Sequence, residues 1–179
     1  MRFTRHRGGV RAELEPIEAQ VLTQLANEIL GIVEPAESSD DPLAALVGLP
    51  AGDVDPPEDP VLLRLLPDAY RDDHDAASDF RRYTDSDLRA TKRGHATVVL
   101  ETVPEAGGRM ELDRDQADAW LGCLNDMRLA LGTSLGVTEE MDVEAIDEEH
   151  PARQALEVYE WLGFLQESLL SCLDPRVSG

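Results

Sequence analysis

The sequence predicts an α+β protein that is mainly α-helical: a helical bundle with a small antiparallel sheet, made of an N-terminal hairpin and one strand near residues 108–113. Two observations support this prediction. Apolar residues recur at helical spacing over several long segments, whereas strand-like alternation is confined to two short ones. The length of 179 residues suits a single domain, 1–179, with an excursion rich in proline and acidic residues at 34–60.

The hairpin is predicted over residues 1–14, where apolar and polar residues alternate on both sides of Gly8-Gly9. A two-residue turn at these glycines would pair Phe3 with Leu14. A lone hairpin is only marginally stable in water. We therefore expect a third strand at 108–113, where the alternation resumes.

The first helix is expected to begin at Pro16 and to end near Glu34-Pro35, because proline suits the first helical turn and disrupts later ones. Residues 34–60 then hold six of the eleven prolines, eight acidic residues and no basic residue. We interpret this segment as an excursion from one domain. Helical spacing in the first helix predicts a buried stripe formed by Ile17, Val21, Leu25, Ile29 and Ile32.

The middle of the chain is predicted to form three helices. Asp59-Pro60 should begin a short helix that Pro67 ends. Residues 69–82 and 85–103 follow as two separate helices, although the apolar run at 97–100 would also suit a strand.

Two longer helices complete the prediction. Asp113 and Gln116 have the spacing of a capping box at the start of an amphipathic helix. The last helix is expected over 151–174 and is apolar over a wide arc, which includes Trp161 and Phe164. A helix with so wide an apolar arc is either central to a domain or part of an interface, so a homodimer stays open.

The charge is unevenly distributed. The chain has 37 acidic residues against 16 Lys and Arg, which gives a net charge of -21. This balance disfavours nucleic-acid binding, because such binding depends on basic side chains that displace counterions from phosphates. Residues 1–11 are the exception: they contain no acidic residue and four arginines, Arg2, Arg5, Arg7 and Arg11. These arginines are either solvated surface or a docking patch for an acidic partner, and a direct DNA contact would have to go through them.

Membrane and secreted proteins are not indicated. The longest uncharged run is the eleven residues 42–52, well short of the ~20 that a spanning helix needs. No apolar block follows the basic start, as a secretory signal would require. We therefore expect a cytoplasmic protein.

The sequence offers one weak candidate for a metal centre. Asp72-Asp73-His74-Asp75 contains suitable ligands, but consecutive helical residues point about 100° apart, so further ligands such as His95 or His150 would be needed. A metal-dependent hydrolase centred on His74 and Asp75 is thus the alternative function. A solvated acidic helix explains the same residues, and no phosphate-binding or nucleophile motif is present. No catalytic residue, metal ligand or cofactor is predicted.

Cys123 and Cys172 are the candidate redox residues. Both lie among apolar neighbours on predicted helices, where cysteine commonly acts as a small hydrophobic residue. If these helices formed a simple hairpin, Cys123 would face residue 159, and Cys172 would lie about thirteen residues, or roughly 20 Å, further along the axis. That distance exceeds the reach of a disulfide, but the long connection at 132–150 leaves other arrangements open, including pairing between subunits.

Four segments carry a family resemblance: Leu65-Leu66-Pro67-Asp68-Ala69-Tyr70, Gly107-Gly108-Arg109-Met110-Glu111-Leu112, residues 119–133 and residues 159–167. With the hairpin, they resemble an actinobacterial family of uncharacterised proteins, encoded beside the N-end-rule adaptor of the Clp protease. The resemblance implies a helical α+β domain and an oxidative-stress-linked transcriptional regulator that works through a sigma factor. It supplies no catalytic residue.

Taken with the absence of a catalytic motif, this resemblance predicts a non-enzymatic regulatory protein that acts through protein–protein interaction. The expected partner is a sigma factor or another transcription component. The candidate contact residues are the four N-terminal arginines together with Trp161 and Phe164.

Overall fold

The computed structural model describes residues 1–34, 57–70, 73–138 and 151–174. These residues form five helices and one three-stranded antiparallel sheet, which confirms the predicted mainly helical α+β class. The single-domain organisation stays a prediction, because most of the excursion at 34–60 lies outside the described residues. The elements in chain order are β1 (Thr4–His6), β2 (Gly9–Leu14), α1 (Pro16–Ile32), α3 (Pro60–Leu65), α4 (His74–Thr102), β3 (Gly108–Leu112), α5 (Arg114–Ser134) and α6 (Arg153–Leu173).

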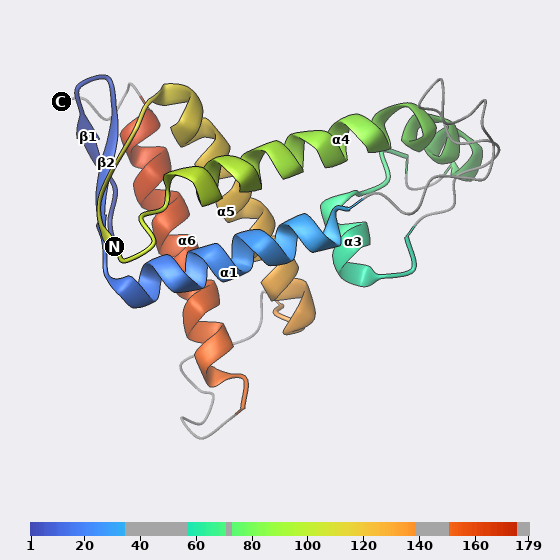
Figure 1. Cartoon of the computed structure of the whole chain (residues 1–179). Helices are drawn as coiled ribbons and strands as arrows, with labels where there is room; N and C mark the ends of the chain where they lie inside the picture. The colour runs from blue at the N-terminus through green and yellow to red at the C-terminus, as the bar shows by residue number, and fades with distance from the viewer. Residues whose placement is uncertain (35–56, 71–72, 139–150, 175–179) are drawn as a thin grey trace.

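The four long helices form two pairs. Helices α1 and α4 pack side by side in opposite directions, and α5 and α6 form a second antiparallel pair that crosses the first (Figure 1). The sheet lies at one end of this arrangement, beside α5 and α6. Within the described ranges, no helix is both long enough and apolar enough to cross a membrane.

The sheet has the order β1-β2-β3, so the predicted third strand is confirmed. The predicted turn is wrong by one residue. Thr4 pairs with Arg11 across the hairpin, and the turn residues are Arg7 and Gly8, with φ angles of 45° and 87°. Phe3 therefore does not pair with Leu14, although both still lie on the buried face, because moving the turn by one residue moves the partner by two.

Gly9 is a strand residue rather than a turn residue. A β-carbon built on it would overlap the backbone oxygen of Leu112 in β3. The second glycine is thus needed for the close approach of two strands, and the first for the left-handed turn. The sequence alone does not separate these two roles.

Helix α1 begins at Pro16 as predicted, and the side chain of Glu18 accepts a hydrogen bond from the backbone N–H of Glu15 (2.8 Å). The predicted buried stripe is only partly confirmed: Leu25 and Ile32 are half-buried against the core, and Val21 is also half-buried. Ile29 is buried, but Ile17 is 64% exposed. The buried row consists of Ala19, Leu22, Ala26 and Ile29, and its small alanines face the closely packed α4 and α5.

Helices α3 and α4 begin with aspartate caps. Asp59 Oδ1 accepts from the backbone N–H of Val61 (2.7 Å) and of Leu62 (3.2 Å), as expected for an N-cap. Helix α4 is one continuous helix, so the prediction of two helices at 69–82 and 85–103 is wrong, while the helical assignment of 97–100 is confirmed. The polar stretch near 84–87 does not break it, since Arg89 Nε donates to Asp85 Oδ2 (2.6 Å) one turn away.

The predicted capping box starts α5: Asp113 N–H donates to Gln116 Oε1 (3.0 Å), and Gln116 N–H donates to Asp113 Oδ1 (2.8 Å). On the buried face of this helix, Trp120 Nε1 donates to Thr102 Oγ1 of α4 (2.8 Å). The Trp120 ring also packs edge-on against Phe3, with 5.8 Å between centroids. Trp120 therefore joins the sheet, α4 and α5 in one core.

The close approach at Gly9 is testable. We expect Gly9→Ala to lower the free energy of unfolding by about 2–3 kcal/mol, because the new methyl group forces β2 away from Leu112. Gly94→Ala in the middle of α4 is the matched control: no atom lies within 4 Å of its added β-carbon, so it should raise stability by up to about 1 kcal/mol. Urea unfolding followed by circular dichroism measures both. Equal effects would contradict the proposed packing.

Candidate functional site

The most buried polar cluster lies between α4 and α5. Lys92 Nζ and Asp126 Oδ1 form an ion pair at 2.6 Å, and Asp126 is only 2% exposed. His95, one turn after Lys92, packs against Gly122, where a β-carbon would overlap the imidazole ring. Cys123 is completely buried one turn before Asp126. The ion pair between Lys92 and Asp126 thus fixes the position of α4 along α5.

Burial determines the protonation of this cluster. It raises the pKa of the Asp126 carboxyl, and the hydrogen bond and positive charge of Lys92, followed by the charge of His95, oppose that rise. Burial also raises the pKa of the Cys123 thiol to about 12, with a further increase from the Asp126 charge and an opposing effect of Lys92. The Cys123 thiol is thus protonated at neutral pH and poorly suited to react with an oxidant.

The sequence reasoning missed Asp126 and Lys92. Two signals were present: Lys92 is the one lysine in the chain, and Asp126 interrupts the apolar face of the predicted helix. A buried carboxylate needs a charged or hydrogen-bonding partner, so an acidic residue at such a position predicts one.

The candidate metal centre gains no support. Asp73 Oδ1 accepts from the backbone N–H of Ala76 (3.0 Å) as the N-cap of α4, and Asp75 is exposed. Asp72 and His150 lie outside the described residues, as does the side chain of His74. In the described part of the chain, no group of three or more His, Cys, Asp or Glu residues could hold a metal ion.

Cys172 lies in the last turn of α6, where two arginines bind the terminal carbonyl groups. Arg5 Nε donates to the Cys172 oxygen (2.9 Å), and its Nη2 donates to the oxygens of Ser171 (3.2 Å) and Asp174. Arg114 Nη1 donates to the Leu173 oxygen (3.0 Å). Cations at this end of a helix interact favourably with its dipole and its unpaired carbonyls. Arg5 therefore fastens the hairpin to α6.

The Cys172 thiol is half-buried. Burial raises its pKa, while the nearby charges of Arg5 and Arg2 lower it. Both cysteines are free thiols. Cys172 is the more accessible of the two.

The register of the α5–α6 pair differs from the simple hairpin. Gln166 Nε2 donates to Asn125 Oδ1 (3.3 Å), and the Tyr159 ring lies 2.9 Å from a β-carbon built at Gly132. Cys123 consequently faces a residue near 168 and not 159. Its offset from Cys172 along the axes is about four residues, or roughly 6 Å, and the expected 20 Å is wrong.

The candidate contact residues fall into two separate places. Arg2 and Arg7 are exposed on the hairpin, and Arg11 is half-buried there. Trp161 is half-buried against the core, and Phe164 is 49% exposed. Phe164 precedes Cys172 by eight residues of α6, or about 12 Å, so the structure does not join the aromatic residues and the arginines in one surface.

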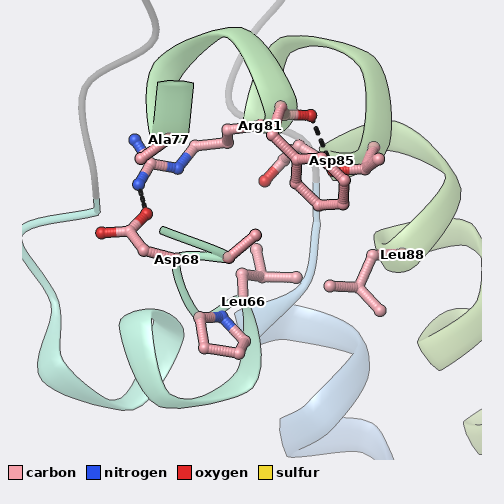
Figure 2. Close-up of a pocket in the computed structure, with 10 residues that line it drawn as sticks. Leu66, Asp68, Ala77, Arg81, Asp85 and Leu88 are labelled. Atoms are coloured by element: carbon pink, nitrogen blue, oxygen red, sulfur yellow. Dashed lines mark hydrogen bonds and ion pairs between the residues drawn. The ribbon is translucent and has the colours of Figure 1, made fainter. Parts of the chain in front are cut away.

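A second exposed aromatic surface, which the sequence reasoning missed, lies at the far end of α4. Arg81 is buried there and pairs with Asp68 beside a small hollow lined in part by Leu66 and Leu88 (Figure 2). This hollow, about 20 Å³, is water-sized. Three exposed rings lie at this end of α4, and we term them the aromatic corner: Phe80 (46% exposed), which lines the hollow, Tyr70 (51%), whose ring contacts that of Phe80, and Tyr83 (62%), one turn after Phe80.

Breaking the buried ion pair should make the stability of the protein depend on pH. Lys92→Met leaves Asp126 ionised without a partner, so we expect a loss of about 3–5 kcal/mol at pH 7.5. Removing Lys92 raises the folded-state pKa of Asp126 further above its unfolded value, and stability is then recovered as falling pH protonates the carboxyl. The loss in free energy of unfolding relative to wild type, measured by urea unfolding, should therefore become smaller as the pH is lowered towards 5. In Lys92→Met/Asp126→Asn, which has no carboxyl to titrate, that recovery should be absent.

The two thiols should differ in reactivity. We expect iodoacetamide to label Cys172 in the folded protein, faster at higher pH, because its half-buried thiol has to ionise first. Cys123 should be labelled only in urea, since a pKa of about 12 leaves on the order of one thiolate in ten thousand at pH 8. Mass spectrometry of peptides measures both rates. Equal labelling of the folded protein would contradict the burial of Cys123.

Comparison with known proteins places this structure in a family. Residues 1–173 match the model of a domain of unknown function, DUF2017. Proteins named oxidative stress regulator AosR from Mycobacterium tuberculosis and Mycobacterium bovis are each 38% identical over 178 residues, which cover 91% of this chain and 81% of theirs. No solved structure matches the chain significantly. The chain belongs to the DUF2017 family, which the match over residues 1–173 and the identity to the mycobacterial AosR proteins both show.

Proposed function

We propose that this chain is a non-enzymatic oxidative-stress regulator that acts by binding a protein of the transcription machinery, with a sigma factor as the expected partner. The observation that carries the proposal is the 38% identity, over nearly the whole chain, to proteins named oxidative stress regulator. The name of these relatives assigns them a regulatory role, and we propose the same role for this chain.

The described structure supports contact with a protein more than catalysis. Its most buried charged residues are engaged in ion pairs, Asp126 with Lys92 and Arg81 with Asp68, which hold these side chains in the fold. The aromatic corner instead exposes three rings at one end of α4 in a protein with few aromatic residues. Tyr70 and Phe80 are in edge-to-face contact, with 6.1 Å between ring centroids. Exposed aromatic residues are enriched in protein–protein interfaces.

An oxidant signal would be received at Cys172 rather than at Cys123. Cys172 is half-buried at the end of α6, where burial raises the pKa of its thiol and the charges of Arg5 and Arg2 partly offset that rise. Cys123 lies in the core with its pKa raised to about 12. Of the two redox candidates, we therefore assign the sensing role to Cys172.

Complementation tests the function. The chain should restore peroxide survival to a mycobacterial strain from which the AosR gene has been deleted. Phe80→Ser/Tyr83→Ser should fail to restore it, because the aromatic corner is lost, while Ile17→Ser, which alters an equally exposed apolar residue on α1, should succeed. Binding of the purified variants to purified sigma factors gives the direct readout. Restoration by none of the proteins, or equal restoration by all of them, would refute the proposal.

A further inference from the structure

We infer that the N-terminal hairpin carries a docking surface for a short acidic segment of another protein. This inference extends the proposed function, on which it rests, by naming the chemistry of a partner and the surface that receives it. We term this surface the arginine face: it comprises Arg2, Arg11 and Arg109, which line one hollow, and Arg7, which lines a separate hollow at the hairpin turn.

The arginine face has a hollow on the outer side of the sheet. Thr4, Arg11 and Glu111 lie opposite one another across the three strands, as do Glu13 and Arg109. Arg2, Arg11 and Arg109 line a hollow of about 410 Å³ together with Thr4, Ala12 and Glu13. A second hollow of about 340 Å³, at the hairpin turn, is lined by Arg5, Arg7, Arg114 and Cys172 among others.

Most of these guanidinium groups are available for a ligand. Within the described residues, Arg2, Arg7 and Arg11 make no ion pair, unlike Arg89 and Arg153, which bind acidic residues one turn away on their own helices. Arg109 binds Glu111 at 2.9 Å with both side chains more than half exposed, and such a surface pair is weak. The hairpin thus presents unsatisfied positive charge in a chain with a net charge of -21.

Arg7 occupies its position at a cost in backbone energy. Its φ of 45° lies in the left-handed region that glycine and asparagine adopt more easily, and its side chain is exposed at the turn. Nothing in the described structure requires an arginine there for folding. The exposed guanidinium of Arg7, which makes no ion pair within the described residues, is thus placed to contact a partner.

The observations favour an acidic peptide over a nucleic acid. Outside residues 1–11 the chain carries a net charge of -25, so a duplex, with a phosphate every ~1.7 Å, would extend beyond the arginines and meet an acidic body. A short acidic segment can contact the arginines without reaching the rest of the acidic body, although Glu13 and Glu111 share this face with them. Arginine also matches carboxylates well, because its planar group donates two parallel hydrogen bonds to one carboxylate.

Fluorescence anisotropy of a fluorescein-labelled peptide of ten glutamates tests the inference. Wild-type protein should bind it, with an affinity that falls as salt rises from 50 to 200 mM. Arg2→Glu/Arg7→Glu should weaken binding at least about 10-fold, because it replaces two attractive contacts with repulsive ones. Arg64→Glu/Arg93→Glu is the matched control: it makes the same change in net charge at two exposed arginines on α3 and α4, and it should weaken binding less than about 3-fold.

A second readout and a folding control make the result decisive. Bound peptide should slow the alkylation of Cys172, which borders the hollow at the hairpin turn. Thermal melting must show that both variants fold; Arg5 is left intact because it fastens the hairpin to α6. Arg7→Asn should fold at least as stably as wild type and still bind the peptide more weakly.

Three results would overturn the inference: no binding of the peptide, an equal loss in both double variants, or tighter binding of a labelled DNA duplex than of the peptide. These results are separable from a failure of the proposed function. The peptide assay needs no oxidant, sigma factor or cell, whereas complementation can fail while the peptide still binds.

Discussion

Helix α5 lies at the centre of the described structure and contacts every other helix and the sheet. The rest of the fold depends on how closely these elements can approach α5. Small residues make that approach possible: Gly122 admits the ring of His95, and Gly132 admits the ring of Tyr159. The one carboxylate on its buried face, Asp126, is tolerated only because Lys92 of α4 neutralises it. A buried ion pair adds little net stability compared with apolar packing, but it penalises any register in which the partners are apart.

The sequence predicts those parts of the fold that local chemistry decides. The aspartate cap of α3, the capping box of α5, the proline at the start of α1 and the third strand follow from short-range signals, and all are confirmed. The parts that fail depend on distant partners. The buried side of α1 is set by the approach of α4 and α5, and Gly9 is fixed by a carbonyl group 103 residues later in the chain, at Leu112.

The same division applies to the candidate sites. Residue type alone identifies the cysteines and the N-terminal arginines as candidates, but not their different environments: Arg5 binds the end of α6, while Arg7 stands exposed at the turn. The burial that distinguishes Cys123 from Cys172 comes from the packing of α5, and the aromatic corner arises only when the segment after α3 packs against α4. The family membership, in contrast, follows from segments that are legible in the sequence itself.

The position of Trp120 gives the molecule a built-in optical reporter. Its indole ring is buried, donates a hydrogen bond to Thr102 of α4 and contacts Phe3. The other tryptophan, Trp161, is partly exposed to solvent. Indole emission shifts to longer wavelength when water reaches the ring. Separation of the hairpin from the helices would therefore register as a red shift of the Trp120 component, without any label.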